Sequence, residues 1–193
     1  LVGSGLGLTL NLPLALSDRQ TWQLDRRNLT FGDTVSGTAD WIINTTSQVY
    51  WNVASGYNGN LTVTNITYIN RFYKTGQWAK SLTMRGAGGN PRWELAFTNA
   101  VQWSTLFPSR TANVGIWHGL TSGGTLQFDD GDTFVFPGAQ LTFDNGYGIQ
   151  NGGTLSGAGL QVQYADYKSR YTMNGGTLAL TSAIYLGNGL QYI

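Results

Sequence analysis

The sequence predicts an all-β protein, most simply an antiparallel β-sandwich or barrel that follows a short N-terminal β-strand segment. Three observations support this prediction. No window shows the sustained i, i+3, i+4 apolar spacing of an amphipathic helix. Stretches rich in β-branched and aromatic residues lie at 41–50, 60–69, 95–103 and 133–143. Asn-Gly dipeptides, typical of tight hairpin turns between antiparallel strands, recur at 58–59, 145–146, 151–152, 174–175 and 188–189.

The N-terminal segment carries leucines at every second position from Leu6 to Leu16. A period of two places all of them on one face of a strand. Pro13 lies among them and has no backbone N–H to donate, which favours an edge position in a sheet. The leucine face must be covered, either by another part of this chain or by copies of the chain around a symmetry axis.

Composition narrows the range of partners. Only 11% of the 193 residues are charged, the formal net charge is +1, and the basic residues are scattered, so neither nucleic acid nor an anionic membrane is indicated. No apolar stretch reaches the roughly 18 residues of a membrane-spanning helix. Cysteine is absent, which excludes disulfides and thiolate metal sites. We expect no cofactor, and we expect stability to come from packing or assembly.

The character of the chain changes near residue 119. All seven tryptophans lie between Trp22 and Trp117, and the sequence beyond Gly119 is rich in glycine. A Gly-Thr-Leu triplet recurs at 124–126, 153–155 and 176–178. These features fit either a repeating β-solenoid or a plain β-meander whose turns require glycine. The irregular spacing of the triplets favours the meander.

The first 31 residues combine the alternating leucines, a polar turn at 17–20, and a second apolar series formed by Trp22, Leu24, Leu29 and Phe31. This arrangement resembles the last shaft repeat of trimeric viral fibres, as in adenovirus fibres and reovirus attachment proteins. Phage and bacterial trimeric fibre tips use the same alternation of apolar residues, so the resemblance extends to them. The resemblance implies a shaft-like trimerising segment at 1–31 and a β-rich head at 32–193. The change of composition near residue 119 would divide this head into a Trp-rich part and a Gly-rich β-meander. The resemblance further implies a homotrimer, exposed outside the cell on a virion or a bacterial surface, whose head binds a host receptor or glycan.

Residues suited to catalysis are few. His118 is the single histidine, and no G-x-S-x-G segment is present to hold a nucleophilic serine. Asp129, Asp130 and Asp132 cluster in one segment, most simply a polar turn, with weak calcium binding as an alternative. We therefore expect a binding protein and not an enzyme. The alternative, a polysaccharide-degrading tailspike-type enzyme, would require one of these aspartates beside Glu94 or Asp40 in a groove.

The abundance of tryptophan and tyrosine in a weakly charged β protein favours carbohydrate binding, because the C–H faces of sugars stack on aromatic rings. Residues 85–93 form a polar, glycine-rich stretch between strands, which is typical of an exposed binding loop. Core packing is the alternative for each tryptophan taken singly. A monomeric carbohydrate-binding module is a further alternative to the attachment domain. The predicted binding residues are Trp78, Arg85, Asn90, Arg92, Trp93 and Trp117.

Overall fold

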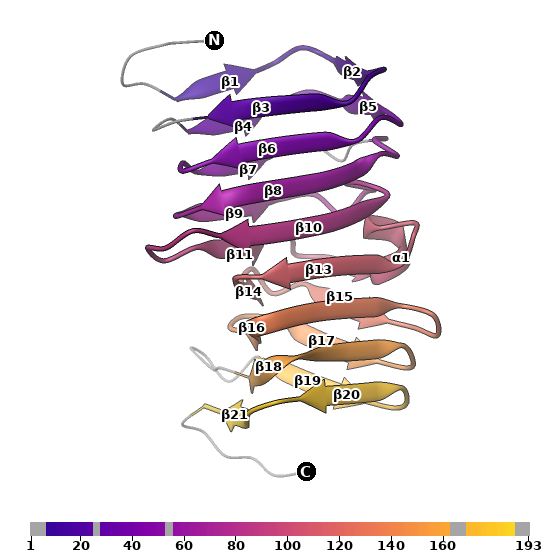
Figure 1. Ribbon diagram of the computed structural model, residues 1–193. Helices are drawn as coiled ribbons and strands as arrows, with labels where there is room; N and C mark the ends of the chain where they lie inside the picture. The colour runs from indigo at the N-terminus through magenta and orange to yellow at the C-terminus, as the bar shows by residue number, and fades with distance from the viewer. Residues whose placement is uncertain (1–6, 25–27, 53–55, 163–168, 188–193) are drawn as a thin grey trace.

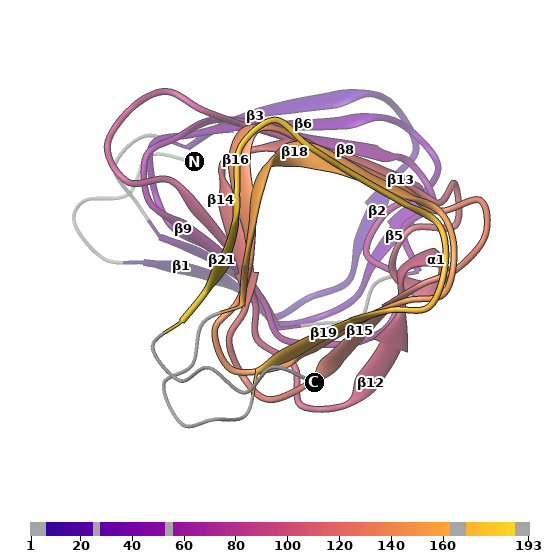
Figure 2. The ribbon, with the colours of Figure 1, turned by 90° about the horizontal axis from the view of Figure 1, so that it is seen from below.

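The computed structural model describes residues 7–24, 28–52, 56–162 and 169–187. The chain winds into a β-solenoid of about eight turns, in which 57% of the residues are in strands (Figure 1). Every strand pair among the described residues is parallel. Viewed along its axis, the coil is right-handed and roughly three-sided (Figure 2).

The first face of the solenoid carries one strand from each turn. Its strands begin at residues 20, 41, 60, 81, 111, 133, 154 and 177, so successive turns are 19 to 23 residues long except for one of 30. The strands are β3 (Gln20–Leu24), β6 (Trp41–Thr45), β8 (Asn60–Ile66), β10 (Ser81–Gly86), β13 (Thr111–Gly115), the first part of β16 (Thr133–Phe143), the first part of β18 (Thr154–Val162) and β20 (Thr177–Leu180).

After each first-face strand the chain turns a corner and enters the second face. In β16 and β18 the strand continues through the corner, where the register shifts between Phe136 and Gln140. The second face contains β1 (Leu8–Leu10), β4 (Leu29–Phe31), β7 (Val49–Trp51), β9 (Ile69–Phe72), β11 (Arg92–Leu95), β14 (Trp117–Leu120), the second parts of β16 and β18, and β21 (Ile184–Leu186).

The return side leads the chain from the second face back to the first. At the N-terminal end it holds a two-stranded sheet, β2 (Leu14–Leu16) with β5 (Val35–Gly37). Further along it holds a four-stranded sheet of β12 (Ala100–Gln102), β15 (Thr125–Phe128), β17 (Tyr147–Gln150) and β19 (Arg170–Met173). The helical turn α1 (Trp103–Leu106) follows β12 and accounts for part of the long turn between β10 and β13.

Inward side chains stack in rows along the interior of the coil, because equivalent residues of successive turns lie in register. One row on the second face holds Leu29, Val49, Asn70, Trp93, His118, Leu141 and Leu160. Ring contacts run through the interior, for example between Phe31 and Trp51 at a centroid distance of 4.4 Å. Gly157 leaves room for one of these rings, since a Cβ at this position would collide with the ring of Phe136. The core is therefore a continuous column of rows.

The prediction of an antiparallel sandwich or barrel is wrong, and the repeating solenoid that ranked below the meander is observed. The alternation that identifies a strand is the same in parallel and antiparallel sheets, so it could not decide between them. The Asn-Gly pairs at 151–152 and 174–175 turn corners of the coil and do not close hairpins. They precede Gly153 and Gly176, whose φ angles of +72° and +84° require glycine.

The N-terminal leucines line the first turn of the solenoid. Leu8 and Leu10 on β1, and Leu14 on β2, pack against the core, whereas Leu12 lies between these strands and is 60% exposed. Leu6 lies outside the described residues. Within the described residues β1 pairs only with β4, and the ladders continue across the predicted boundaries near 31 and 119. The chain itself thus covers part of the leucine face, and the homotrimer stays a prediction.

His118 is the one ionisable side chain in its inward row. It is fully buried, its Nδ1 lies 2.9 Å from the carbonyl oxygen of Ile116, and its ring packs against Phe134 and Phe136 at 4.8 and 5.1 Å. Burial lowers the pKa of His118 to about 4, although the Ile116 carbonyl opposes this shift. Between pH 6.5 and 4 the unfolded chain therefore takes up a proton that the native state excludes.

We predict that the free energy of unfolding falls by about 3 kcal/mol from this site as the pH drops from 6.5 to 4, at about 1.4 kcal/mol per pH unit. Urea unfolding at several pH values measures this dependence. The variant His118→Leu cannot titrate there, so its slope should be flatter than that of the wild type, while the carboxylates contribute equally to both. Identical slopes for the two proteins would contradict the prediction.

Candidate functional site

Four of the six predicted binding residues meet at one corner, between the first and second faces. Arg85 lies near the end of β10, Asn90 lies in the loop that follows, and Arg92 begins β11. Trp117 begins β14 in the next turn and is the register partner of Arg92. The structure thus brings together residues 25 positions apart in the sequence. We call these four residues the arginine corner.

Contacts orient the side chains of the arginine corner. The guanidinium carbon of Arg92 lies 5.3 Å from the centroid of the Trp117 ring, a cation–π arrangement, and its Nε donates a hydrogen bond of 3.3 Å to Oδ1 of Asn90. The Trp117 ring lies over Gly119, where a Cβ would be 2.9 Å from the indole. An indole spread over the outside of the sheet in this way offers a platform for a ligand.

Arg85 completes the arginine corner on the side of the first face. Its Nη1 donates hydrogen bonds to the carbonyl oxygens of Met84 and Asn113, at 2.8 and 3.1 Å. Neither Arg85 nor Arg92 forms an ion pair with a carboxylate among the described residues. The corner therefore keeps its positive charge next to a partly exposed indole.

The other two predicted residues, Trp78 and Trp93, lie in the core. Their exposed fractions are 2% and 0%, and Trp78 packs on Phe72 at a centroid distance of 4.5 Å. Strand alternation explains the contrast between neighbours, because it turns Arg92 outward and Trp93 inward. Neither indole can contact a ligand at the surface of this fold.

Sequence reasoning missed a polar row on the outer side of the second face. Tyr50, Arg71 and Glu94 are register partners on β7, β9 and β11. Nε of Arg71 donates a hydrogen bond of 2.6 Å to Glu94, with which the guanidinium also forms an ion pair, and Arg71 lies 5.9 Å from the ring of Tyr73. The Glu94 carboxylate is thus neutralised by its neighbour. Only knowledge of the register could have revealed this row.

An open groove lies along the same corner of the solenoid, on its N-terminal side. Its volume is about 600 Å³. Three successive turns supply its lining residues, which are Asn28, Thr46, Ser47, Gln48, Thr67 and Tyr68. We call it the Tyr68 groove. The sequence carried no motif for it, since its residues are far apart in the chain.

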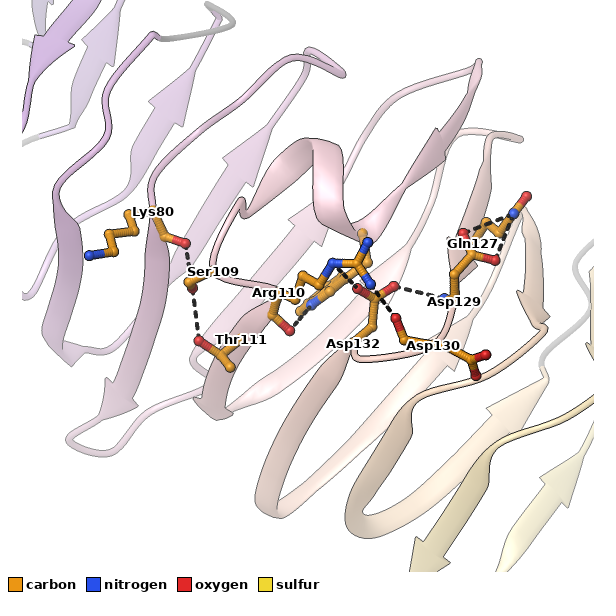
Figure 3. Close-up of polar contacts among 9 residues, drawn as sticks. Lys80, Ser109, Arg110, Thr111, Gln127, Asp129, Asp130 and Asp132 are labelled. Atoms are coloured by element: carbon orange, nitrogen blue, oxygen red, sulfur yellow. Dashed lines mark hydrogen bonds and ion pairs between the residues drawn. The ribbon is translucent and has the colours of Figure 1, made fainter.

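The aspartate cluster lies at a different corner, between the return side and the first face (Figure 3). Oδ2 of buried Asp132 accepts a hydrogen bond of 2.7 Å from the backbone N–H of Asp129, and Nε of Arg110 lies 3.9 Å from Oδ1 of Asp132. Arg110 also donates to the carbonyl oxygen of Asp130. Burial raises the pKa of Asp132, an effect that the Asp129 N–H and Arg110 oppose. The segment is a hydrogen-bonded turn.

The structure does not bring together the carboxylates that the tailspike-type alternative requires. Glu94 lies on the second face, paired with Arg71, and Asp40 precedes β6, four strands from β16 on the first face. Four strand spacings separate Asp40 from Asp132 by about 19 Å. Over the described residues, no group of histidine, cysteine, aspartate or glutamate side chains is arranged to hold a metal ion.

Comparisons with known proteins add no relatives, since no family model, curated protein or solved structure matches the chain significantly. No helix in the described part of the chain is long and apolar enough to cross a membrane. The functional argument therefore rests on the geometry of the arginine corner and the Tyr68 groove.

We predict that substitution of Trp93 and of Trp117 lowers stability by very different amounts. Trp93→Ala removes a fully buried indole and should lower the free energy of unfolding by about 3–5 kcal/mol. Trp117→Ala removes a partly exposed indole from the outer surface and should cost about 1 kcal/mol or less. Urea unfolding measures both values. A larger loss for Trp117→Ala than for Trp93→Ala would contradict these assignments.

Proposed function

We propose that the protein is a non-enzymatic attachment domain that binds a glycan at the arginine corner. The observation that carries this proposal is the Arg92 guanidinium over the outward Trp117 indole, with which no carboxylate of the described residues forms an ion pair. An indole offers an apolar surface to the C–H face of a sugar ring. Arginine donates paired hydrogen bonds to two oxygens of one oxyanion. A sugar that bears a carboxylate or sulfate group matches both features.

The same proposal includes the place where the domain is displayed and the partner that it binds. The domain would be displayed outside the cell, at the tip of a homotrimeric fibre on a virion or a bacterial surface, and its partner would be a receptor or glycan on a host cell. Three copies of one weak site bind far more tightly together than singly, which suits adhesion. The resemblance of residues 1–31 to fibre shafts and the leucines that line the first turn support this setting.

We predict that Arg92→Ala weakens binding to acidic glycans on an array roughly ten- to hundredfold, because a charged hydrogen bond contributes about 1.5–3 kcal/mol. Binding by the wild type should also weaken as salt is raised. Arg170→Ala provides a matched control, since Arg170 lies 6.0 Å from the ring of Tyr147 on the return side, away from the corner. The proposal fails if the wild type binds no glycan or if both variants bind equally.

We predict a solution mass of about three times the 21.0 kDa of one chain, measured by light scattering on a size-exclusion column. Such a mass supports a homotrimeric fibre. A mass equal to that of one chain would contradict the trimer and would favour the alternative of a monomeric carbohydrate-binding module. Release of new sugar chain ends from a bound polysaccharide would instead favour the tailspike-type enzyme.

A further inference from the structure

We infer that the Tyr68 groove, whose described lining is polar and uncharged, is a second subsite that holds neutral sugar units of a linear glycan lying parallel to the solenoid axis. The inference rests on the proposed function, because it extends the glycan site of the arginine corner. It adds the direction of the ligand, its minimum length and the chemistry of its units.

The two subsites form one continuous surface. The backbone N–H of Asn90 donates a hydrogen bond of 3.3 Å to the carbonyl oxygen of Thr67, and that of Arg92 donates one of 3.1 Å to Tyr68. The loop of the arginine corner therefore lies directly against the edge of the groove. No intervening turn separates the two subsites.

The surface runs along the axis and crosses successive turns. Asn28, Gln48 and Tyr68 immediately precede β4, β7 and β9, and Arg92 and Trp117 begin β11 and β14. Four strand spacings correspond to about 19 Å along the axis. A ligand that touches both ends must be extended and must span several sugar units.

The lining residues that the structure describes are polar, and none of them carries a charge. Thr46, Ser47 and Thr67 offer hydroxyl groups, and Asn28 and Gln48 offer amides. These groups both donate and accept hydrogen bonds, as sugar hydroxyls do. Neighbouring contacts hold some of them in place, since Thr67 donates to the carbonyl oxygen of Thr46 at 2.7 Å. The groove thus matches neutral sugars, whereas the arginine corner matches an acidic one.

Tyr68 is an unusual aromatic residue in this fold. Its side chain is 58% exposed, although most aromatic rings of the chain are buried in the column of inward rows. The other exposed large hydrophobic side chains in the described part of the chain lie near the two ends of the solenoid. They are Leu12, Met173, Ile184, Tyr185 and Leu186. An exposed ring in the middle of the solenoid, beside a polar groove, provides a stacking surface for a sugar.

The test compares binding across glycan length. The probes are size-fractionated hyaluronan and unsulfated chondroitin, from disaccharide to decasaccharide, because both alternate an acidic sugar with an uncharged N-acetylated sugar. Wild-type affinity should increase with length until the chain spans both subsites. Calorimetry or biolayer interferometry measures the affinities.

Tyr68→Ala should lose about tenfold in affinity for the long fragments and keep the wild-type affinity for the disaccharide. Arg92→Ala should bind every length more weakly. Tyr185→Ala, which removes a 46% exposed tyrosine from β21, is the matched control and should behave as the wild type. Urea unfolding of each variant verifies that it is folded.

Affinity that does not depend on length, or a Tyr68→Ala variant that matches the wild type at every length, would overturn the second subsite and leave the proposed function intact. A wild type that binds neither probe at any length would overturn this inference for such alternating glycans. In that case the glycan array, which tests the arginine corner alone, decides separately whether the proposed function fails as well.

Discussion

The structure depends on the parallel register between successive turns. Each residue lies about 4.8 Å above its equivalent in the next turn, so every inward position becomes a row that extends along the coil. A row is stable only when consecutive side chains fill the space between them. The contacts from Phe31 to Trp51 and from Trp51 to Phe72, at 4.4 and 5.2 Å, show large rings that meet this requirement. A chain without disulfides gains much of its stability in this way.

The same register builds the outer surface. It places Arg92 beside Trp117 and Arg71 beside Glu94, although the members of each pair are more than 20 residues apart. The two pairs differ in charge, because Glu94 neutralises the Arg71 guanidinium, whereas no carboxylate in the described part of the chain forms an ion pair with Arg92. A ligand-binding surface can therefore arise on the outside of a solenoid without any change to the rows inside it.

The corners of the coil are less constrained than its faces, and they divide into two kinds. At the corner of Asp129, side chains bond to one another across turns: Asn151 donates to Asp129 and Asn174 donates to Asn151, each at 2.9 Å. Such a corner uses its polar side chains to link successive turns. The loop of Asn90 and the Tyr68 groove instead leave charged, polar and aromatic groups at the surface, and the proposed glycan site lies there.

The amino-acid sequence by itself determined that the protein is all-β, that side chains alternate along its strands, that an exposed loop lies between β10 and β11, and that most tryptophans prefer the core. Each of these depends on alternation or turn chemistry within a few residues, which is visible along the chain. The tertiary structure alone decided that the strands are parallel, that Trp93 faces inward while Trp117 lies across the outside, and that Asn28, Gln48 and Tyr68 line one groove. These features depend on which turn pairs with which, and a period of two is identical in every such pairing.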